Sequence, residues 1–379
     1  MRQPRLRVAL DTTFAGVNPT GVGLYSRKLA EHLAAIAPES GLALKCFGPA
    51  CGQRSAHPLL DTMQEWPTYT QFMLPLALRK HHPHLVHSTS HLGPLWGHGK
   101  LIVTVHDLIF RRYPRDYNPI WLSLTNALLP HVLRRADAVI ADSEATRNDI
   151  VRYYGFARRK VKVVYPGINR EYAESRATPE EAAIALNKLG IGANPYILCL
   201  GPWVRRKNLS VVLRAFALAH HELPGMRLVI TGSTPRGMKG ESETPARLLE
   251  ALPAGVRSRV HLMGYVSSSH LRVLLQNANV LAYPSRYEGF GLPPLEAMSA
   301  GVPVVASHTP AVVEVTGGAA LYANPDSPQE WKDRFLQVAL SPETAAILIQ
   351  AGLHRSALFS WERCAQETAD VYRVVSAEG

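Results

Sequence analysis

The sequence predicts an α/β protein built from two doubly wound domains, and two observations lead to this prediction. Short apolar runs rich in β-branched residues alternate with helix-like patterns along almost the whole chain. Near-continuous apolar strands, each followed by a helix, indicate parallel sheets that are covered on both faces. The chain also has 379 residues, which is too long for one typical core and fits two domains of ordinary size.

The predicted strands fall into two series, and each series is sufficient for one doubly wound sheet. The first series occupies residues 6–11, 42–48, 84–88, 101–107, 138–143 and 161–166. The second series occupies residues 196–201, 227–231, 259–264, 279–285, 302–307 and 319–324.

Helix starts and polar segments suggest where the domains meet. Residues 178–181 (TPEE) and 327–330 (SPQE) both have the capping-box pattern, with proline in the first turn. The segment 169–181 is polar and contains no predicted strand, so it is the expected linker. We therefore expect an N-terminal domain over residues 1–175 and a C-terminal domain over residues 176–358. Residues 359–379 form a separate C-terminal segment, and this segment could pack back onto the N-terminal domain.

The final segment has the periodicity of an amphipathic helix over residues 360–377. This periodicity predicts a set of inward-facing positions, namely Trp361, Cys364, Ala365, Val371 and Val374.

The composition narrows the class of protein and of partner. Hydrophobic residues make up 46% of the chain and charged residues 19%, as in globular proteins. No apolar run approaches the roughly 20 residues of a membrane span, and no secretory signal pattern opens the sequence, so we expect a cytoplasmic protein. Lysine and arginine exceed acidic residues by 41 − 30 = 11, which favours anionic partners. Nucleic acid is not expected, because zinc-finger spacing and aromatic RNA-binding patterns are absent from the sequence.

A glycine-rich loop, residues 12–23, follows the first predicted strand and opens into an amphipathic helix. Gly21 and Gly23 let the backbone approach a phosphate or sugar, although a turn needed only for packing would also explain them. The loop departs from the dinucleotide fingerprint, because Ser26 replaces its third glycine and no ribose-binding acid follows the second strand. A nicotinamide or flavin cofactor is therefore disfavoured.

Two charged motifs in the second half carry the main functional signal. The stretch GPWVRRKNLSVVLRAF (201–216) places Arg206 and Lys207 in a loop after the first strand of the second domain. The stretch RYEGFGLPPLEAMSAGVPVV (286–305) places Glu288 and Glu296 on either side of a turn rich in glycine and proline.

These motifs resemble the retaining glycosyltransferases of family 4, which have the GT-B fold. The resemblance also covers residues 104–108 (TVHDL), 141–150 (ADSEATRNDI) and 163–169 (VVYPGIN), and thus nearly the whole chain. It implies two Rossmann-like domains facing across a cleft, with the acceptor on the N-terminal side and a nucleotide-sugar donor on the C-terminal side.

The resemblance implies a role for each charged residue of the second domain. Arg206 and Lys207 clamp the donor diphosphate, where cations stabilise the departing phosphate. A solvated basic turn is the alternative explanation for both residues.

The resemblance also makes Glu296 the ribose ligand and Glu288 the residue that positions the donor hexose. The alternative for Glu288 is a loop cap. Between the two glutamates, the N–H groups of Phe290, Gly291 and Leu292 are expected to contact sugar hydroxyls or phosphate. Pro293 and Pro294 lack an N–H group, so they pre-set the helix start and cannot hold phosphate.

In the N-terminal domain, the resemblance implies that His106 contacts the donor sugar or the acceptor on the reacting face. A general-base role is open, because same-face substitution would let the donor phosphate accept the proton. A structural histidine is the third alternative. Gly21 and Gly23 are expected on the donor-binding surface.

No metal or cofactor is expected. The histidines of HHPHLVHSTSH (81–91) suggest a metal site, but no HExxH, Cys/His or Asp-x-Asp pattern accompanies them. The segment 65–82 combines aromatic residues, an apolar run and terminal cations. Insertion among lipid headgroups and burial as a core helix with a basic end are equally consistent with it. Basic residues within 134–162 add to the case for an anionic membrane surface.

The predicted function is metal-independent, retaining transfer of a hexose from a nucleotide sugar to a glycan or a polyprenyl-diphosphate-linked acceptor, in polysaccharide biosynthesis. GDP-mannose is the favoured donor, because the motifs most resemble bacterial mannosyltransferases. UDP-glucose and UDP-N-acetylglucosamine are alternatives, as are a GT-B phosphorylase or epimerase, a nicotinamide oxidoreductase and a basic adaptor without catalysis. The predicted location is the cytoplasm, peripheral to the inner face of the membrane.

Overall fold

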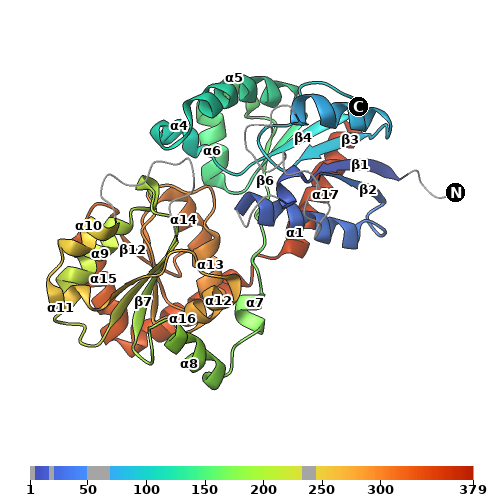
Figure 1. Cartoon of the computed structure of the whole chain (residues 1–379). Coiled ribbons are helices and arrows are strands. Elements are labelled where there is room, and N and C mark those ends of the chain that lie inside the picture. The colour runs from blue at the N-terminus through green and yellow to red at the C-terminus, as the bar shows by residue number, and fades with distance from the viewer. Residues whose placement is uncertain (1–4, 17–20, 49–68, 233–244, 379) are drawn as a thin grey trace. The chain divides into compact units, whose positions relative to one another are not determined.

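A computed structural model describes residues 5–16, 21–48, 69–232 and 245–378, which form two compact units (Figure 1). Unit 1 comprises Met1–Leu108, Pro119–Gly167 and Phe359–Gly379, and unit 2 comprises Ile109–Asn118 and Ile168–Leu358. The predicted linker, residues 169–181, belongs to unit 2 in this division and carries α7 (Glu171–Glu174) and the start of α8 (Pro179–Lys188). The C-terminal segment belongs to unit 1.

Unit 1 contains a parallel sheet in the order β2-β1-β3-β4-β5-β6. The strands are β1 (Leu6–Asp11), β2 (Leu42–Phe47), β3 (Leu85–Ser88), β4 (Lys100–Val105), β5 (Ala138–Ala141) and β6 (Val161–Val163). The helical elements of this unit are η1 (Thr13–Gly16), α1 (Gly21–Ile36), η3 (Tyr69–Met73), α3 (Leu74–Arg79), α5 (Pro119–Arg135), α6 (Glu144–Tyr153), η5 (Gly155–Ala157) and α17 (Trp361–Ala377).

Unit 2 contains a second parallel sheet, in the order β12-β11-β10-β7-β8-β9. The strands are β7 (Tyr196–Leu200), β8 (Arg227–Thr231), β9 (Val260–Leu262), β10 (Val280–Tyr283), β11 (Val304–Ser307) and β12 (Leu321–Ala323). The helical elements, besides α7 and α8, are α4 (Ile109–Arg112), η4 (Pro114–Asp116), η6 (Arg205–Lys207), α9 (Leu209–Ala219), α10 (Pro245–Glu250), α11 (Ala254–Arg257), α12 (Ser268–Gln276), α13 (Leu292–Ser299), α14 (Pro310–Thr316), α15 (Pro328–Leu340) and α16 (Pro342–Ser356). Every predicted strand is present, and the prediction of two doubly wound α/β domains is confirmed.

The two predicted capping boxes have different outcomes. At α8 the box is complete, because Thr178 accepts from the N–H of Glu181 and the Glu181 carboxylate accepts from the N–H of Thr178. At α15 only one half forms: Ser327 accepts from the N–H of Glu330. The Glu330 carboxylate instead accepts from the N–H of Asn324, since the N–H of Ser327 already donates to the Asn324 carbonyl.

The C-terminal helix α17 packs into the core of unit 1, against Tyr25, Leu29 and Leu33 of α1. Its buried stripe runs through Trp361, Cys364, Ala365, Thr368, Ala369, Tyr372 and Val375. The prediction of Val374 as an inward position was therefore wrong: Val374 is exposed, because helical spacing from Tyr372 brings Val375 onto the buried face.

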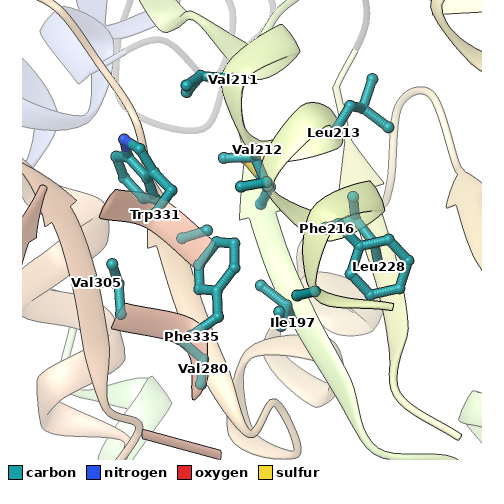
Figure 2. Close-up of a cluster of buried hydrophobic side chains, with 14 of the residues drawn as sticks. Ile197, Val211, Val212, Leu213, Phe216, Leu228, Val280, Val305, Trp331 and Phe335 are labelled. Carbon is teal, nitrogen blue, oxygen red and sulfur yellow. The ribbon is translucent and has the colours of Figure 1, made fainter. Parts of the chain in front are cut away.

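In unit 2, α9 and α15 cover one face of the sheet. Figure 2 shows Trp331 and Phe335 of α15 packed with Phe216 of α9 and with strand residues such as Ile197 and Val280. These side chains are all buried, and burying each contributes on the order of 1.5–3 kcal/mol. This core fixes β7 and β10, and with them the loops that leave their carboxyl ends.

Within the part of the chain that the structure describes, no single helix is long and apolar enough to cross a membrane. The two helical stretches Pro328–Leu340 and Pro342–Ala377 pass on length and composition only together, as a pair bent by 96°.

Candidate active site

The strand order of unit 2 creates a switch point between β7 and β10, which are neighbours in the middle of the sheet. Ligands of doubly wound sheets bind outside the carboxyl ends of the strands at such a point. The short helix η6 follows β7, and the loop that carries Glu288 follows β10. The fold therefore brings residues of the two predicted motifs, which are about 80 positions apart in the chain, to one edge of the sheet.

Lys207, Arg206 and Glu288 form an ion cluster at this edge. The Lys207 Nζ atom lies 2.6 Å from Glu288 Oε1, and the Arg206 Nη1 atom lies 3.3 Å from the same oxygen. Lys207 also donates to the Tyr283 hydroxyl at 3.2 Å. Two cations against one carboxylate leave a net positive charge, which suits an anionic ligand.

The electrostatics keep this cluster ionised. Burial alone would raise the pKa of Glu288, but the charges of Lys207 and Arg206 outweigh it and lower the pKa to about 2. Burial lowers the pKa of Lys207, and the charge of Glu288 opposes that effect. The carboxylate therefore holds the buried ammonium in its charged form.

Further contacts join the two loops, and sequence reasoning did not identify them. The N–H of Arg286 donates to the Arg206 carbonyl at 2.7 Å, and the Asn208 amide donates to the Pro284 carbonyl at 3.3 Å. Asn208 has a positive φ of 53°, a conformation that asparagine tolerates better than most residues. Gly201 has φ +137°, and an added Cβ there would lie 3.3 Å from the Lys207 stem. Asn208 and Gly201 thus define the path of the loop around Lys207.

Glu296 lies on α13 and is half-buried. Burial raises the pKa of its carboxyl to about 7. Over the described residues, no group hydrogen-bonds to this carboxylate, and its charge contributes to the raised pKa of nearby Tyr172. A carboxylate with open acceptor positions can accept bonds from two adjacent hydroxyls.

The turn between the two glutamates leads directly into α13. Gly291 is the N-cap with φ +123°, a region that favours glycine, and Phe290 beside it is buried. The first N–H groups of a helix have no intrahelical partner. Pro293 and Pro294 remove two of them, so Gly291 and Leu292 carry the remaining donors of this helix start.

His106 follows β4 in unit 1, and both of its ring nitrogens are engaged. The Nδ1 atom lies 2.7 Å from Asp142 Oδ2, and the Nε2 atom lies 2.9 Å from the Thr89 carbonyl oxygen. Because a carboxylate and a carbonyl only accept, hydrogen bonds at both nitrogens require the protonated ring, and this geometry therefore favours an imidazolium. Burial alone would lower the pKa of His106, but Asp142 and the Thr89 carbonyl raise it overall.

Asp142 is the residue of this pair that the sequence did not reveal. It lies in the stretch ADSEATRNDI (141–150), next to Ser143, the N-cap of α6, which accepts from the N–H of Thr146 at 2.9 Å. Asp142 and His106 are 36 positions apart, and only the adjacency of β4 and β5 joins them.

The predicted glycines of unit 1 lie at the start of α1. Gly21 is the first residue of the helix, and an added Cβ there would meet nothing within 4 Å. Gly23, two residues further on, is buried. Because a Cβ added at position 21 would meet no neighbouring atom, packing does not explain why this residue is glycine. Both residues belong to unit 1, whereas the ion cluster and Glu296 belong to unit 2.

The histidines of residues 81–91 do not converge. His87 is buried between the Tyr372 hydroxyl (2.6 Å) and the Thr104 hydroxyl (2.9 Å), and burial lowers its pKa to about 3. His81 contacts Lys45 at the surface. In the described parts of the chain, no three His, Cys, Asp or Glu side chains gather as metal ligands would.

These features define a class of protein: two doubly wound units of the Rossmann type, the second of which has a cluster of cations and a carboxylate at its switch point. The pattern of the family "Glycosyl transferases group 1" matches residues 184–355, and that of "Glycosyltransferase Family 4" matches residues 19–172. The chain belongs to this family of glycosyltransferases. The predicted family, GT-B fold and hexosyltransferase class are thereby confirmed.

Individual relatives agree with this assignment. O-antigen chain mannosyltransferase B of Escherichia coli is 29% identical over 277 residues, which are 73% of this chain and 71% of that protein. Sucrose-phosphate synthase from Thermosynechococcus elongatus has a TM-score of 0.74 at 22% identity, covering 99% of this chain and 100% of the other. Anabaena HepE, solved with UDP and glucose, has a TM-score of 0.71 at 17% identity, covering 98% and 100%.

Proposed function

We propose that this glycosyltransferase moves a hexose from a nucleoside diphosphate sugar to a glycan acceptor and retains the anomeric configuration of the donor. One observation carries the proposal: Lys207, Arg206 and Glu288 meet at the switch point of unit 2, on loops that their mutual contacts hold together. A preorganised pair of cations is what a departing diphosphate requires.

Each part of the donor has a matching group in unit 2. Arg206 and Lys207 bind the diphosphate, and Glu288 holds Lys207 and positions the hexose. Glu296 accepts bonds from the ribose hydroxyls. The N–H groups at the start of α13 contact the sugar or phosphate.

The state of His106 bears on where the acceptor proton goes. An imidazolium with both nitrogens engaged is unable to act as a general base. We propose that the donor phosphate accepts the acceptor's proton as the sugar–phosphate bond breaks on the same face. In this proposal His106 is a fixed positive charge and not the base, and the reaction requires no metal.

GDP-mannose is the donor we favour, and polyprenyl-diphosphate-linked glycan is the acceptor. The E. coli relative is named a mannosyltransferase of the O-antigen chain, and this name supports mannose as the sugar and a glycan as the acceptor. Such an acceptor would place the enzyme in the cytoplasm, peripheral to the inner face of the membrane. UDP-glucose is the second candidate donor, because the similar Anabaena protein holds UDP and glucose.

A donor panel tests this function. The enzyme is incubated with labelled GDP-mannose, UDP-glucose or UDP-N-acetylglucosamine, a lipid-linked oligosaccharide and excess EDTA. Nucleoside diphosphate and a glycan extended with retained configuration are the expected products. Formation of a sugar phosphate from the donor and inorganic phosphate would indicate a phosphorylase and contradict transfer. Release of the free sugar, or epimerisation of the sugar nucleotide, without an extended glycan would also contradict transfer.

A further inference from the structure

We infer that one face of unit 1 docks on a bilayer containing anionic lipid. This apolar–basic face comprises Phe72, Met73, Leu76, Arg79, Lys80 and Trp96. The inference rests on the proposed function in one respect: the proposed purpose of membrane docking is to bring the enzyme to a lipid-linked acceptor.

The segment η3–α3 is apolar on two opposite sides, and only one side is buried. Leu74 and Leu78 lie in the interior of unit 1. Phe72, Met73 and Leu76 are 60%, 59% and 53% exposed. The alternative prediction, a core helix with a basic end, explains why Leu74 and Leu78 are apolar. It does not explain the three exposed apolar side chains. Adjacent exposed apolar side chains of this size mark a surface that meets another apolar phase.

Hydrogen bonds hold this face in place. Gln71 is buried, and its side chain donates to the Gly93 carbonyl at 3.0 Å and accepts from the N–H of Leu95 at 3.0 Å. The Trp96 indole donates to the Gln71 carbonyl at 2.6 Å, so Trp96, 39% exposed, lies beside the η3 turn. An aromatic ring with one polar end suits the interfacial region of a bilayer.

The charged residues that belong to this face are basic. Residues 69–100 contain no aspartate or glutamate, and Arg79 and Lys80 at the end of α3 are exposed. Arg135, which follows a run of residues without acidic side chains and precedes Asp137, donates to the Gly97 carbonyl at 3.3 Å. Apolar side chains flanked by cations bind anionic lipid by burial and by charge together. A second copy of this chain would set like charges against each other, so charge opposes self-association through this face.

Vesicle binding by the full-length protein tests the inference. Wild type should bind phosphatidylcholine vesicles that contain phosphatidylglycerol, and bind pure phosphatidylcholine more weakly. Phe72→Ser with Leu76→Ser should lower the affinity for the mixed vesicles by at least about tenfold, since each side chain loses most of its burial. Arg79→Glu with Lys80→Glu should remove the preference for anionic lipid.

The matched control replaces two equally exposed apolar residues of unit 2. Leu340 and Ile347 are 61% and 62% exposed, and Leu340→Ser with Ile347→Ser should leave vesicle affinity unchanged. Thermal unfolding of every variant shows whether it folds, and only folded variants are compared.

Several results would overturn the inference: no vesicle binding by wild type, equal binding by the Phe72/Leu76 variant, or an equal loss in the control. Dimerisation of wild type that the Phe72/Leu76 variant loses, without vesicle binding, would assign the face to a second copy instead. Vesicle binding through this face by a protein that transfers no sugar supports the inference and contradicts the proposed function, so the two failures are distinguishable.

Discussion

Lys207 and Glu288 form an ion pair of 2.6 Å between the loops that leave β7 and β10, the two strands that flank the switch point of unit 2. The pair therefore has two consequences. It keeps a buried ammonium charged where the proposed donor diphosphate binds, and it holds the two loops of the site together. Catalysis and stability can be separated by substituting one partner or both.

Lys207→Ala should lower kcat/KM by about 30- to 1000-fold, equivalent to ~2–4 kcal/mol of transition-state stabilisation, the scale for one preorganised electrostatic group. Steady-state kinetics with GDP-mannose and acceptor measure this effect. Lys188→Ala makes the same chemical change at an exposed position of α8 and should leave kcat/KM unchanged. A Lys207→Ala enzyme with wild-type kcat/KM would remove Lys207 from the proposed phosphate clamp.

Lys207→Met alone should destabilise unit 2 by about 3 kcal/mol, because the buried Glu288 carboxylate loses its closer cation and keeps only the more distant one, Arg206, at 3.3 Å. Adding Glu288→Gln should recover most of that loss, since a neutral amide needs no cation, yet activity should stay low. The folded-state pKa of Glu288, about 2, lies below its ordinary 4.5. The stabilisation from the pair is therefore present above pH 4.5 and is lost as pH falls toward 2.

Urea unfolding of wild type, the single variant and the double variant measures this coupling. A double variant no more stable than Lys207→Met would show that charge pairing is not what stabilises the two loops.

Glu296 should make stability and donor binding depend on pH in opposite directions. Its folded-state pKa of about 7 is above its ordinary 4.5, so its contribution to stability is full below pH 4.5 and is lost as pH rises through 7. Glu296→Gln should therefore raise Tm relative to wild type at pH 8 but not at pH 4.5. Donor affinity of wild type should rise as pH passes 7, because the ionised carboxylate accepts bonds from both ribose hydroxyls.

Thermal unfolding and calorimetric titration across this pH range measure the two effects. Glu250→Gln changes an exposed glutamate and serves as the control. An equal Tm difference between Glu296→Gln and wild type at both pH values would argue against a buried, neutral Glu296.

The pKa of His106 should lie above the 6.5 of an ordinary histidine. It is raised by Asp142, so the stability that His106 contributes is present below 6.5 and is lost as pH rises through the folded-state pKa. Other titratable groups around it are Asp107, Tyr25, His87 and His91. Asp142→Asn should lower the pKa of His106 and so increase the fraction of neutral ring at a given pH.

Nitrogen-15 NMR of labelled histidine distinguishes the imidazolium from the neutral ring, since a protonated and an unprotonated ring nitrogen have different chemical shifts. Asp107→Asn removes a charge that acts without a direct bond and should lower the pKa less. A neutral His106 in wild type at pH 6 would reopen the general-base role.

Much of the fold was predictable from the sequence because the signals are local. The strands follow apolar runs, and the Thr178 capping box needs only four residues. The half-formed box at Ser327 was not predictable, because the Asn324 carbonyl competes for the same N–H group. Val374 has the same apolar character as Val375, and only packing against α1 decides which is buried.

For the site, the sequence identified Arg206, Lys207, Glu288 and Glu296 as candidates, and their roles remain predictions. It gave no sign that Lys207 and Glu288 pair, or that Asp142 holds His106, because such contacts depend on strand order and not on spacing along the chain. Strand order is decided by the packing of whole helices on the sheet.

Calorimetric titration of GDP-mannose, in the presence of EDTA, into wild type and into Lys207→Ala with Glu296→Ala tests the central claim most directly. The account predicts binding to wild type and a loss of about 100-fold or more in the variant, because a phosphate contact and a ribose contact are removed together. Equal affinity in the two proteins would contradict a donor site at the switch point of unit 2.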